Sequence, residues 1–338
     1  MGFLNNIING IVDFFSGKIP LGDWVESFVD FLVDNFSGPL DSFSEFIATL
    51  IESFEKFLAE GYPISHFIVI VFLITFSIWY KQDKKNLALG TGGTLFLILF
   101  VCSFFWSFEL FYSSGYPLLL ILIFGLIAWT VRDLRLAIFV VPGLTLMWNL
   151  EMWGPVVETL ASIITAVLVA LVIGIPIGIL KAHNKYVDII TRPILDFMQT
   201  IPPFVYLIPA LMLFGLGNVS GVIATVVFAI APPIRLTYLG ITQVDDEIIE
   251  AGKAFGSNWW QMLFKIELPG ALPSIMMGIN QCIMLSLSMV VIASMIGAGG
   301  LGEPVLRALS VIDIGLGFEA GLGVVIIAIV LDRIFGRE

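Results

Sequence analysis

Long apolar stretches separated by short polar turns make up most of the chain after residue 60. A helix that spans a bilayer needs roughly 17–25 mostly apolar residues. Nine stretches approach that length, at residues 64–80, 87–108, 116–131, 136–152, 156–180, 194–216, 219–240, 274–296 and 316–334. The third and fourth are short and share the tight polar link 132–135. The pattern predicts an all-α integral membrane protein with seven to nine spans.

Residues 1–60 are amphipathic rather than uniformly apolar. Apolar positions recur at helical spacing from Leu21 to Leu32 and from Phe43 to Leu58, with Asp and Glu opposite them. Both stretches are too polar to span, so we expect them on the outer membrane surface or on the protein's own flank. Surface helices usually carry Lys or Arg, and these carry acids, so only apolar burial can hold them. They fit a tethering accessory or, alternatively, a segment that handles substrate.

Composition excludes a soluble protein. The chain is 58% hydrophobic and 13% charged, against about 25% charged residues in soluble domains, and its mean hydropathy is +1.01. Residues 1–10 lack a basic region followed by an apolar core, so no cleavable signal peptide is expected. Residues 1–60 carry −8 of the formal net charge of −11, and no basic patch indicates a nucleic-acid partner.

Cysteine and histidine are scarce. Cys102 and Cys282 each lie inside an apolar run and are expected to be small buried hydrophobes rather than a disulfide. His66 and His183 are isolated, so neither a metal site nor the clustered acid and base of a membrane enzyme is predicted. We therefore expect no catalytic residues and no metal.

The basic residues predict the topology. Lys and Arg concentrate on the cytoplasmic side of membrane proteins. With the N-terminus outside and the C-terminus in the cytoplasm, 13 of the 16 basic residues are cytoplasmic, and only Lys18, Lys56 and Arg307 lie outside. The opposite orientation would reverse this ratio. The chain is thus expected to be a multi-pass inner (plasma) membrane protein whose largest cytoplasmic loop is 241–273.

This loop carries the most informative pattern in the chain. Residues 245–255 can form a short helix that Gly256 ends in a left-handed turn. Ser257 is then expected to cap a second helix, and Pro269 to stop the chain before it re-enters the membrane. The prediction is a helix–turn–helix elbow, which could be a simple capped loop or a docking point. Close approach by another protein is allowed by the small residues Ala251, Gly252 and Ala254.

The loop is similar to the EAA motif of ABC importer permeases, E-A-A-x3-G-x9-I-x-L-P. Every anchor matches except the third, where Gly252 stands in place of Ala. In that family the motif seats in a groove of an ATPase subunit. The resemblance therefore assigns ATPase coupling to Glu250, Ala251, Gly252, Ala254, Phe255, Gly256, Ile266, Leu268 and Pro269.

Residues 153–335 as a whole resemble the permease subunit of proline/glycine betaine ABC importers. The resemblance rests on the runs DFMQTIP (196–202), FVYLIP (204–209), LFGLGN (213–218), IASMIGAGGLG (292–302) and DIGLG (313–317). Residues 21–25 also resemble the amphipathic N-terminal segment of that permease, whereas 61–114 have no clear counterpart. The division expected is an extracytoplasmic amphipathic helical segment at 1–60, additional N-terminal transmembrane helices at 61–152, and the permease core at 153–338.

The resemblance implies the MetI-like core of a type I ABC importer, with extra N-terminal helices. It implies a permease homodimer, two ABC ATPase subunits, an extracytoplasmic substrate-binding protein that delivers a quaternary ammonium osmolyte, and surrounding membrane lipid. The sequence has no G-x-x-x-x-G-K-[ST] run, so ATP would be bound by the partner and the chain itself would need no cofactor. Transport would follow alternating access, driven by the partner's ATP cycle.

The solute path is expected where proline and glycine interrupt the helices. The candidate path residues are Met198, Gln199, Thr200, Pro202 and Pro203, with Asn280 and Gln281 serving either the path or bonds between helices. The core spans place no Asp, Glu, Lys or Arg at mid-membrane, which speaks against an ion-coupled carrier. The alternatives are a permease for another amino acid or compatible solute, and a secondary transporter.

Overall fold

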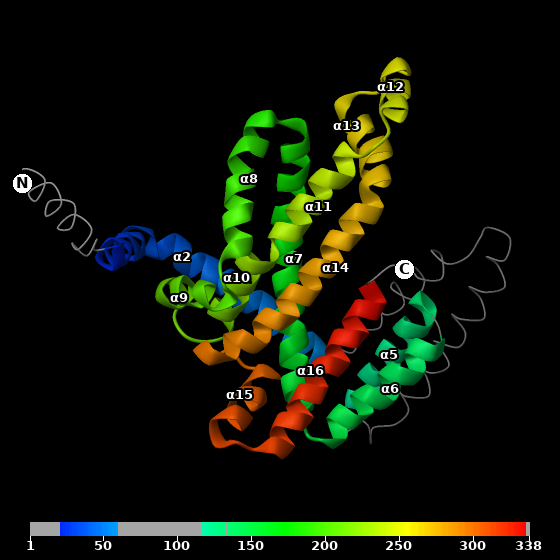
Figure 1. The fold of residues 1–338 in the computed structure, drawn as a ribbon. Helices are drawn as coiled ribbons and strands as arrows, with labels where there is room; N and C mark the ends of the chain where they lie inside the picture. The colour runs from blue at the N-terminus through cyan, green and yellow to red at the C-terminus, as the bar shows by residue number, and fades with distance from the viewer. Residues whose placement is uncertain (1–20, 60–115, 133, 336–338) are drawn as a thin grey trace, which may run out of the picture. The chain divides into compact units, whose positions relative to one another are not determined.

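The computed structural model describes residues 21–59, 116–132 and 134–335, and each regular element in these ranges is a helix (Figure 1). The contacts divide the chain into two units, residues 1–43 and residues 44–338. Several predictions fall outside the described residues: the spans at 64–80 and 87–108, Cys102 and His66.

Helix α2 (Leu21–Ala59) contributes to both units. It is kinked at Phe36, whose φ of −121° is not helical, so the two predicted amphipathic stretches lie on either side of the kink. In the second unit, Ile47, Ile51 and Leu58 are buried within the main hydrophobic core. Residues 44–59 therefore pack against the protein itself, which is one of the two placements expected for this segment.

Four helical stretches of the described chain are long and apolar enough to cross a membrane. They are α7 (Trp153–His183), α10 with α11 (Asn218–Ala229 and Ala231–Thr242), the run Trp259–Ile296 that contains α14 (Leu268–Ala293), and α16 (Ile314–Phe335). Two shorter apolar helices, α5 (Tyr116–Val131) and α6 (Leu134–Asn149), have 16 residues each and pack against one another.

The span expected at 194–216 is not one continuous helix. The chain forms two helices there, α8 (Lys185–Thr200) and α9 (Pro203–Phe214), with an angle of 104° between them. Pro202 and Pro203 explain the break. A residue before proline is pushed out of the helical region, and Ile201 is extended at φ −71° and ψ 129°. Proline favours the first turn of a new helix, so α9 begins at Pro203.

Helix α11 packs between α7 and α14 through glycines. A Cβ atom added at Gly178 of α7 would lie 2.8 Å from the carbonyl oxygen of Ile234 in α11. On the other side, a Cβ at Gly240 of α11 would lie 2.9 Å from the carbonyl oxygen of Ala271 in α14. Small residues at such crossings let helix backbones approach closely in a membrane. These close approaches pack α11 against both of its neighbours.

Beyond α14 the chain turns back through short elements. A 3-10 turn, η3 (Ser294–Ile296), leads into a glycine-rich loop at residues 297–301 and then into α15 (Gly302–Val311). The side chain of Asp313 accepts a hydrogen bond of 3.1 Å from the backbone N–H of Leu316, which caps the start of α16. The glycine-rich loop and α15 lie at the end of the helices opposite α12 and α13 (Figure 1).

Candidate functional site

The elbow begins with α12 (Asp246–Ala254), which matches the helix expected over 245–255. Gly256 has a φ of +75°, and its N–H bonds to the Lys253 carbonyl at 2.9 Å. The next N–H, of Ser257, bonds to the Gly252 carbonyl at 3.1 Å. This is a Schellman motif, in which glycine supplies the left-handed residue. The predicted left-handed turn at Gly256 is confirmed.

The second helix of the elbow begins one residue later than predicted. Asn258, not Ser257, is the N-cap of α13 (Trp259–Met262). The Asn258 side chain accepts from the N–H of Gln261 at 2.8 Å, while the Gln261 side chain accepts from the N–H of Asn258 at 2.9 Å. This reciprocal capping box satisfies two backbone donors at once, which serine at 257 could not do from its position.

Pro269 does not stop the helix, contrary to expectation. A π-helical turn, η2 (Leu263–Glu267), joins α13 to α14, and Pro269 lies in the first turn of α14. Proline lacks the N–H that an α-helix would bond to the carbonyl four residues earlier, and its ring clashes with that carbonyl. In a π turn each N–H bonds to the carbonyl five residues earlier rather than four. The carbonyls before Pro269 are therefore spaced differently from those of an α-helix. The elbow is therefore continuous with the span α14.

Gly252 is the point at which the two arms of the elbow meet. It is buried, and a Cβ atom there would lie 2.4 Å from Cδ1 of Ile266. The departure from Ala in the motif thus accommodates another motif residue, Ile266. The structure places the remaining predicted coupling residues on the same elbow: Glu250, Ala251, Ala254, Phe255 and Pro269 are exposed, and Leu268 is half-buried.

Large apolar side chains cover the outside of the elbow. Phe255 is 91% exposed, Trp260 62% and Phe264 59%. The rings of Trp260 and Phe264 stack with centroids 5.8 Å apart. Such a concentration of exposed aromatic rings on a short loop is typical of a surface that another protein covers.

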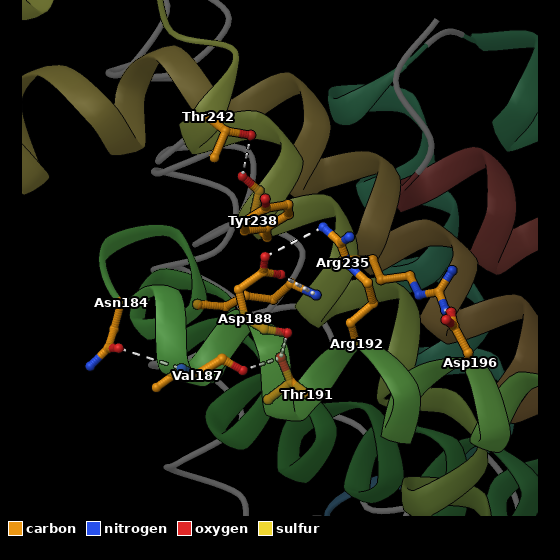
Figure 2. Close-up of polar contacts among 10 residues, drawn as sticks. Asn184, Val187, Asp188, Thr191, Arg192, Asp196, Arg235, Tyr238 and Thr242 are labelled. Atoms are coloured by element: carbon orange, nitrogen blue, oxygen red, sulfur yellow. Dashed lines mark hydrogen bonds and ion pairs between the residues drawn. The ribbon is translucent and has the colours of Figure 1, made fainter.

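Ion pairs tie the neighbouring helix ends together (Figure 2). Lys181, near the end of α7, is only 5% exposed, and its Nζ lies 3.3 Å from Oδ1 of Asp188 in α8. The other carboxylate oxygen of Asp188 lies 3.4 Å from Arg192, one turn further along α8. Arg235 of α11 forms a close ion pair with Asp196 of α8.

Two further contacts extend this network to α11 and to the elbow. Lys181 Nζ lies 4.8 Å from the centre of the Tyr238 ring in α11, a cation–π distance. His183 Nε2 lies 2.9 Å from Oε2 of Glu267, in the π turn of the elbow. The ring of His183 also makes an edge contact with Trp259 at 5.8 Å.

Sequence reasoning missed these residues. The pair Asp188–Arg192 has the spacing of neighbours on a helix and could have been found. The contacts of Lys181 and His183 cross between helices, and no local spacing signals them.

Five of the candidate path residues cluster at the bend between α8 and α9. Gln199, Thr200 and Pro202 are exposed, whereas Met198 and Pro203 are half-buried. The hydroxyl group of Tyr206 in α9 donates to the backbone carbonyl of Met198 across the bend. The bend thus presents polar groups beside backbone that has lost its regular helical pattern.

Asn280 and Gln281 differ in their surroundings. Asn280 Nδ2 donates to Oδ1 of Asp332 in α16 at 3.2 Å, which is a bond between helices. Gln281 is exposed. Of the two roles expected for Asn280, the structure provides a partner for the bond between helices.

The described chain is a bundle of apolar helices, four of them long enough to cross a membrane, with a capped elbow at one end. The model of the family described as "Binding-protein-dependent transport system inner membrane component" matches residues 174–336. The chain is 51% identical over 237 residues to the glycine betaine/carnitine transport permease protein GbuB of Listeria monocytogenes, covering 69% of this chain and 83% of GbuB. The chain belongs to this family, and it is a multi-pass inner-membrane protein.

Two further relatives carry similar names. The glycine betaine/proline betaine transport system permease protein ProW of Escherichia coli is 50% identical over 63% of this chain, which spans 60% of ProW. The glycine betaine transport system permease protein OpuAB of Bacillus subtilis is 50% identical over 64% of this chain and 77% of OpuAB. A chain of the inward-facing MetNI methionine ABC transporter aligns over 56% of this chain and 93% of its own length, with a TM-score of 0.49 and 21% identity.

Proposed function

We propose that this chain is the membrane-spanning permease of an ATP-driven importer for glycine betaine, proline betaine or a related quaternary ammonium osmolyte. The relatives GbuB, ProW and OpuAB, whose names specify glycine betaine, proline betaine or carnitine transport, support this class of solute. A partner ATPase supplies the energy and binds the ATP, and an extracytoplasmic binding protein delivers the solute. The N-terminus lies outside, the C-terminus and the elbow lie in the cytoplasm, and two copies of the chain pair within the lipid bilayer.

The elbow is the observation that carries this proposal. Hydrogen bonds cap the helix before Gly256 and the helix after it, and the Ile266 side chain packs against Gly252 between the two arms. The elbow can therefore be pushed as one body. Its outer face carries the exposed Phe255 and the exposed carboxylate of Glu250. A protein that covers this face would act directly on α14, because the π turn makes the two continuous.

Force on the elbow has a second route into the membrane. The contact of Glu267 with His183 leads to the end of α7, and the pair Lys181–Asp188 leads on to α8. Closure of the partner ATPase dimer would draw two elbows together and move α14 and the α7–α8 hairpin with them. The helices would then part at the opposite end, as alternating access requires.

The bend at Ile201 is the proposed solute path. Its polar groups are neutral: backbone, Gln199 and Thr200. A neutral lining suits a zwitterion with a bulky methylated cation, which needs release rather than a tight grip once the binding protein has delivered it. Strong selection would instead use aromatic rings around the ammonium group, and the binding protein is where we place them.

Uptake of radiolabelled glycine betaine tests the substrate class. The chain is produced with its ATPase and its binding protein in a cell that lacks betaine transport, with choline, carnitine and proline as competitors. We expect uptake that requires all three components. Accumulation by the chain without a hydrolysing partner would identify a secondary transporter, and displacement of betaine by proline alone would identify an amino-acid permease.

Replacement Glu250→Arg tests the elbow. The charge reversal sits on the exposed motif face, so we expect loss of the ATPase from the purified complex and loss of uptake, with normal membrane insertion. Glu303→Arg makes the same charge change at an exposed position of α15, at the opposite end, and should leave ATPase co-purification unchanged. Normal ATPase binding by Glu250→Arg would remove the elbow from its assigned role.

A further inference from the structure

The glycine-rich loop at residues 297–301 is bound by side chains from two distant helices. The N–H of Gly299 donates to Oδ1 of Asn218 at 2.7 Å. The N–H of Gly300 donates to Oε2 of Glu158 at 2.8 Å. The N–H of Leu301 donates to Oγ1 of Thr159 at 2.8 Å. Three successive backbone donors are thus taken up by α7 and by the first residue of α10.

The two anchoring side chains also bind each other. Nδ2 of Asn218 donates to Oε1 of Glu158 at 2.7 Å. The carboxylate therefore receives one hydrogen bond on each oxygen, and the amide uses its nitrogen for Glu158 and its oxygen for the loop. Bonds to a charged carboxylate are shorter and stronger than those between neutral groups. A backbone bond of 3.1 Å from Gly217 N to the Ile296 carbonyl runs beside this clamp of Glu158, Asn218 and the loop.

The glycines are a requirement of the clamp. A Cβ atom at Gly299 would lie 2.0 Å from Oε1 of Glu158. A Cβ at Gly300, whose φ is +81°, would lie 2.5 Å from Oγ1 of Thr159. Any larger residue at either position would push the loop away from α7. The run of glycines, which sequence reasoning left without a role, is what brings the loop backbone within bonding distance.

The position of the clamp connects it to transport. The loop follows α14 through the short turn η3, and α14 is continuous with the elbow at its other end. Glu158 belongs to α7 and Asn218 to α10, so the clamp joins the loop after α14 to α7, which the elbow also moves, and to α10. It does so at the end remote from the elbow, where alternating access needs the helices to part.

We propose that Glu158 and Asn218 are positioning residues that latch the glycine-rich loop over α7 and α10, and that the latch opens whenever the extracytoplasmic side opens. This inference rests on the proposed function. ATP-driven opening must then break these hydrogen bonds. A weakened latch would let the ATPase reach its closed form without the binding protein.

An exchange of the two side chains isolates the latch. Glu158→Gln alone turns an amide NH2 group toward another donor, either Asn218 Nδ2 or the Gly300 N–H. Asn218→Asp alone places two carboxylates against each other. In the double variant Glu158→Gln/Asn218→Asp, Gln donates to Asp, and each still accepts from the loop. The exchange restores every donor–acceptor pair and the single negative charge.

ATP hydrolysis by the reconstituted transporter is the first readout. We expect each single variant to raise hydrolysis without binding protein by about tenfold, the effect of losing one charge-assisted bond. The double variant should return to within about twofold of the wild type. A purely structural role would lower the melting temperature and leave the ratio of basal to stimulated hydrolysis unchanged, which would overturn the proposal.

Cysteine labelling is a second readout that needs no transport. Ala298 is 8% exposed within the same loop. With Ala298→Cys in a background lacking the native cysteines, a membrane-impermeant maleimide should react about tenfold faster in each single variant and at the original rate in the double variant. Equal rates in all four proteins would overturn the latch. Failure of betaine uptake by the wild type would overturn only the proposed function.

Discussion

The crossing of α7 and α11 at Gly178 permits a quantitative prediction. In Gly178→Ala the new Cβ atom would lie 2.7 Å from Cβ of Thr237 and 2.8 Å from the carbonyl oxygen of Ile234. Carbon atoms in favourable contact are about 3.5–4.0 Å apart. The two helices must therefore separate by about 1 Å, because one of the obstructing atoms belongs to the backbone.

Two effects decide the size of the change. Overpacking of a filled site costs about 1–3 kcal/mol. Alanine gains about 0.5–1 kcal/mol over glycine within a helix. The net loss expected for Gly178→Ala is thus about 1–2 kcal/mol, or a decrease of about 1–3 °C in the apparent melting temperature of a chain of 338 residues. Thermal unfolding of the detergent-solubilised chain, followed by tryptophan fluorescence, measures it.

Gly154 provides a matched control in the same helix. A Cβ atom there would have nothing within 4 Å. Gly154→Ala should leave the melting temperature unchanged or raise it, since only the helix propensity changes. If Gly178→Ala were as stable as Gly154→Ala, α7 and α11 could not approach as closely as the structure has them.

Two further predictions concern charged groups. Lys181→Met removes a 5% exposed cation and leaves Asp188 with only the exposed Arg192, so we expect a loss of about 2–3 kcal/mol, somewhat less than for a fully buried pair. Partial burial, and then the nearby charges of Glu158 and Glu52, raise the pKa of Glu55 above its usual range. A raised carboxylate pKa favours the protonated native state, so stability is lost as pH rises through the raised pKa. Glu55→Gln should therefore raise the melting temperature at about pH 7.5 and leave it unchanged at about pH 4.

Each of these has its own control. Adding Asp188→Leu to Lys181→Met removes the unpaired carboxylate and should recover most of the lost stability, and a double variant as unstable as the single would contradict the ion pair. Glu45 lies on the same helix as Glu55 and is exposed. Glu45→Gln should therefore change the melting temperature by the same amount at both pH values. An equal pH response from both substitutions would contradict burial of Glu55.

The sequence alone determined the features that depend on neighbours along the chain. Apolar length predicted α7, α14 and α16, because each must cover a bilayer with its own residues. Gly256 predicted the left-handed end of α12, because only the local backbone decides that conformation. The motif around Glu250 could be recognised for the same reason, since its spacing encodes two short helices and the turn between them.

The tertiary structure decided what depends on distant partners. Pro269 begins a helix instead of ending one, because a π turn formed before it. Glu158 meets Asn218 60 residues away and Gly300 142 residues away. Lys181 and Glu267 are buried charges whose partners lie on other helices. Helical periodicity relates residues three and four apart, whereas the packing of α7, α10 and α14 brings these groups within hydrogen-bond distance.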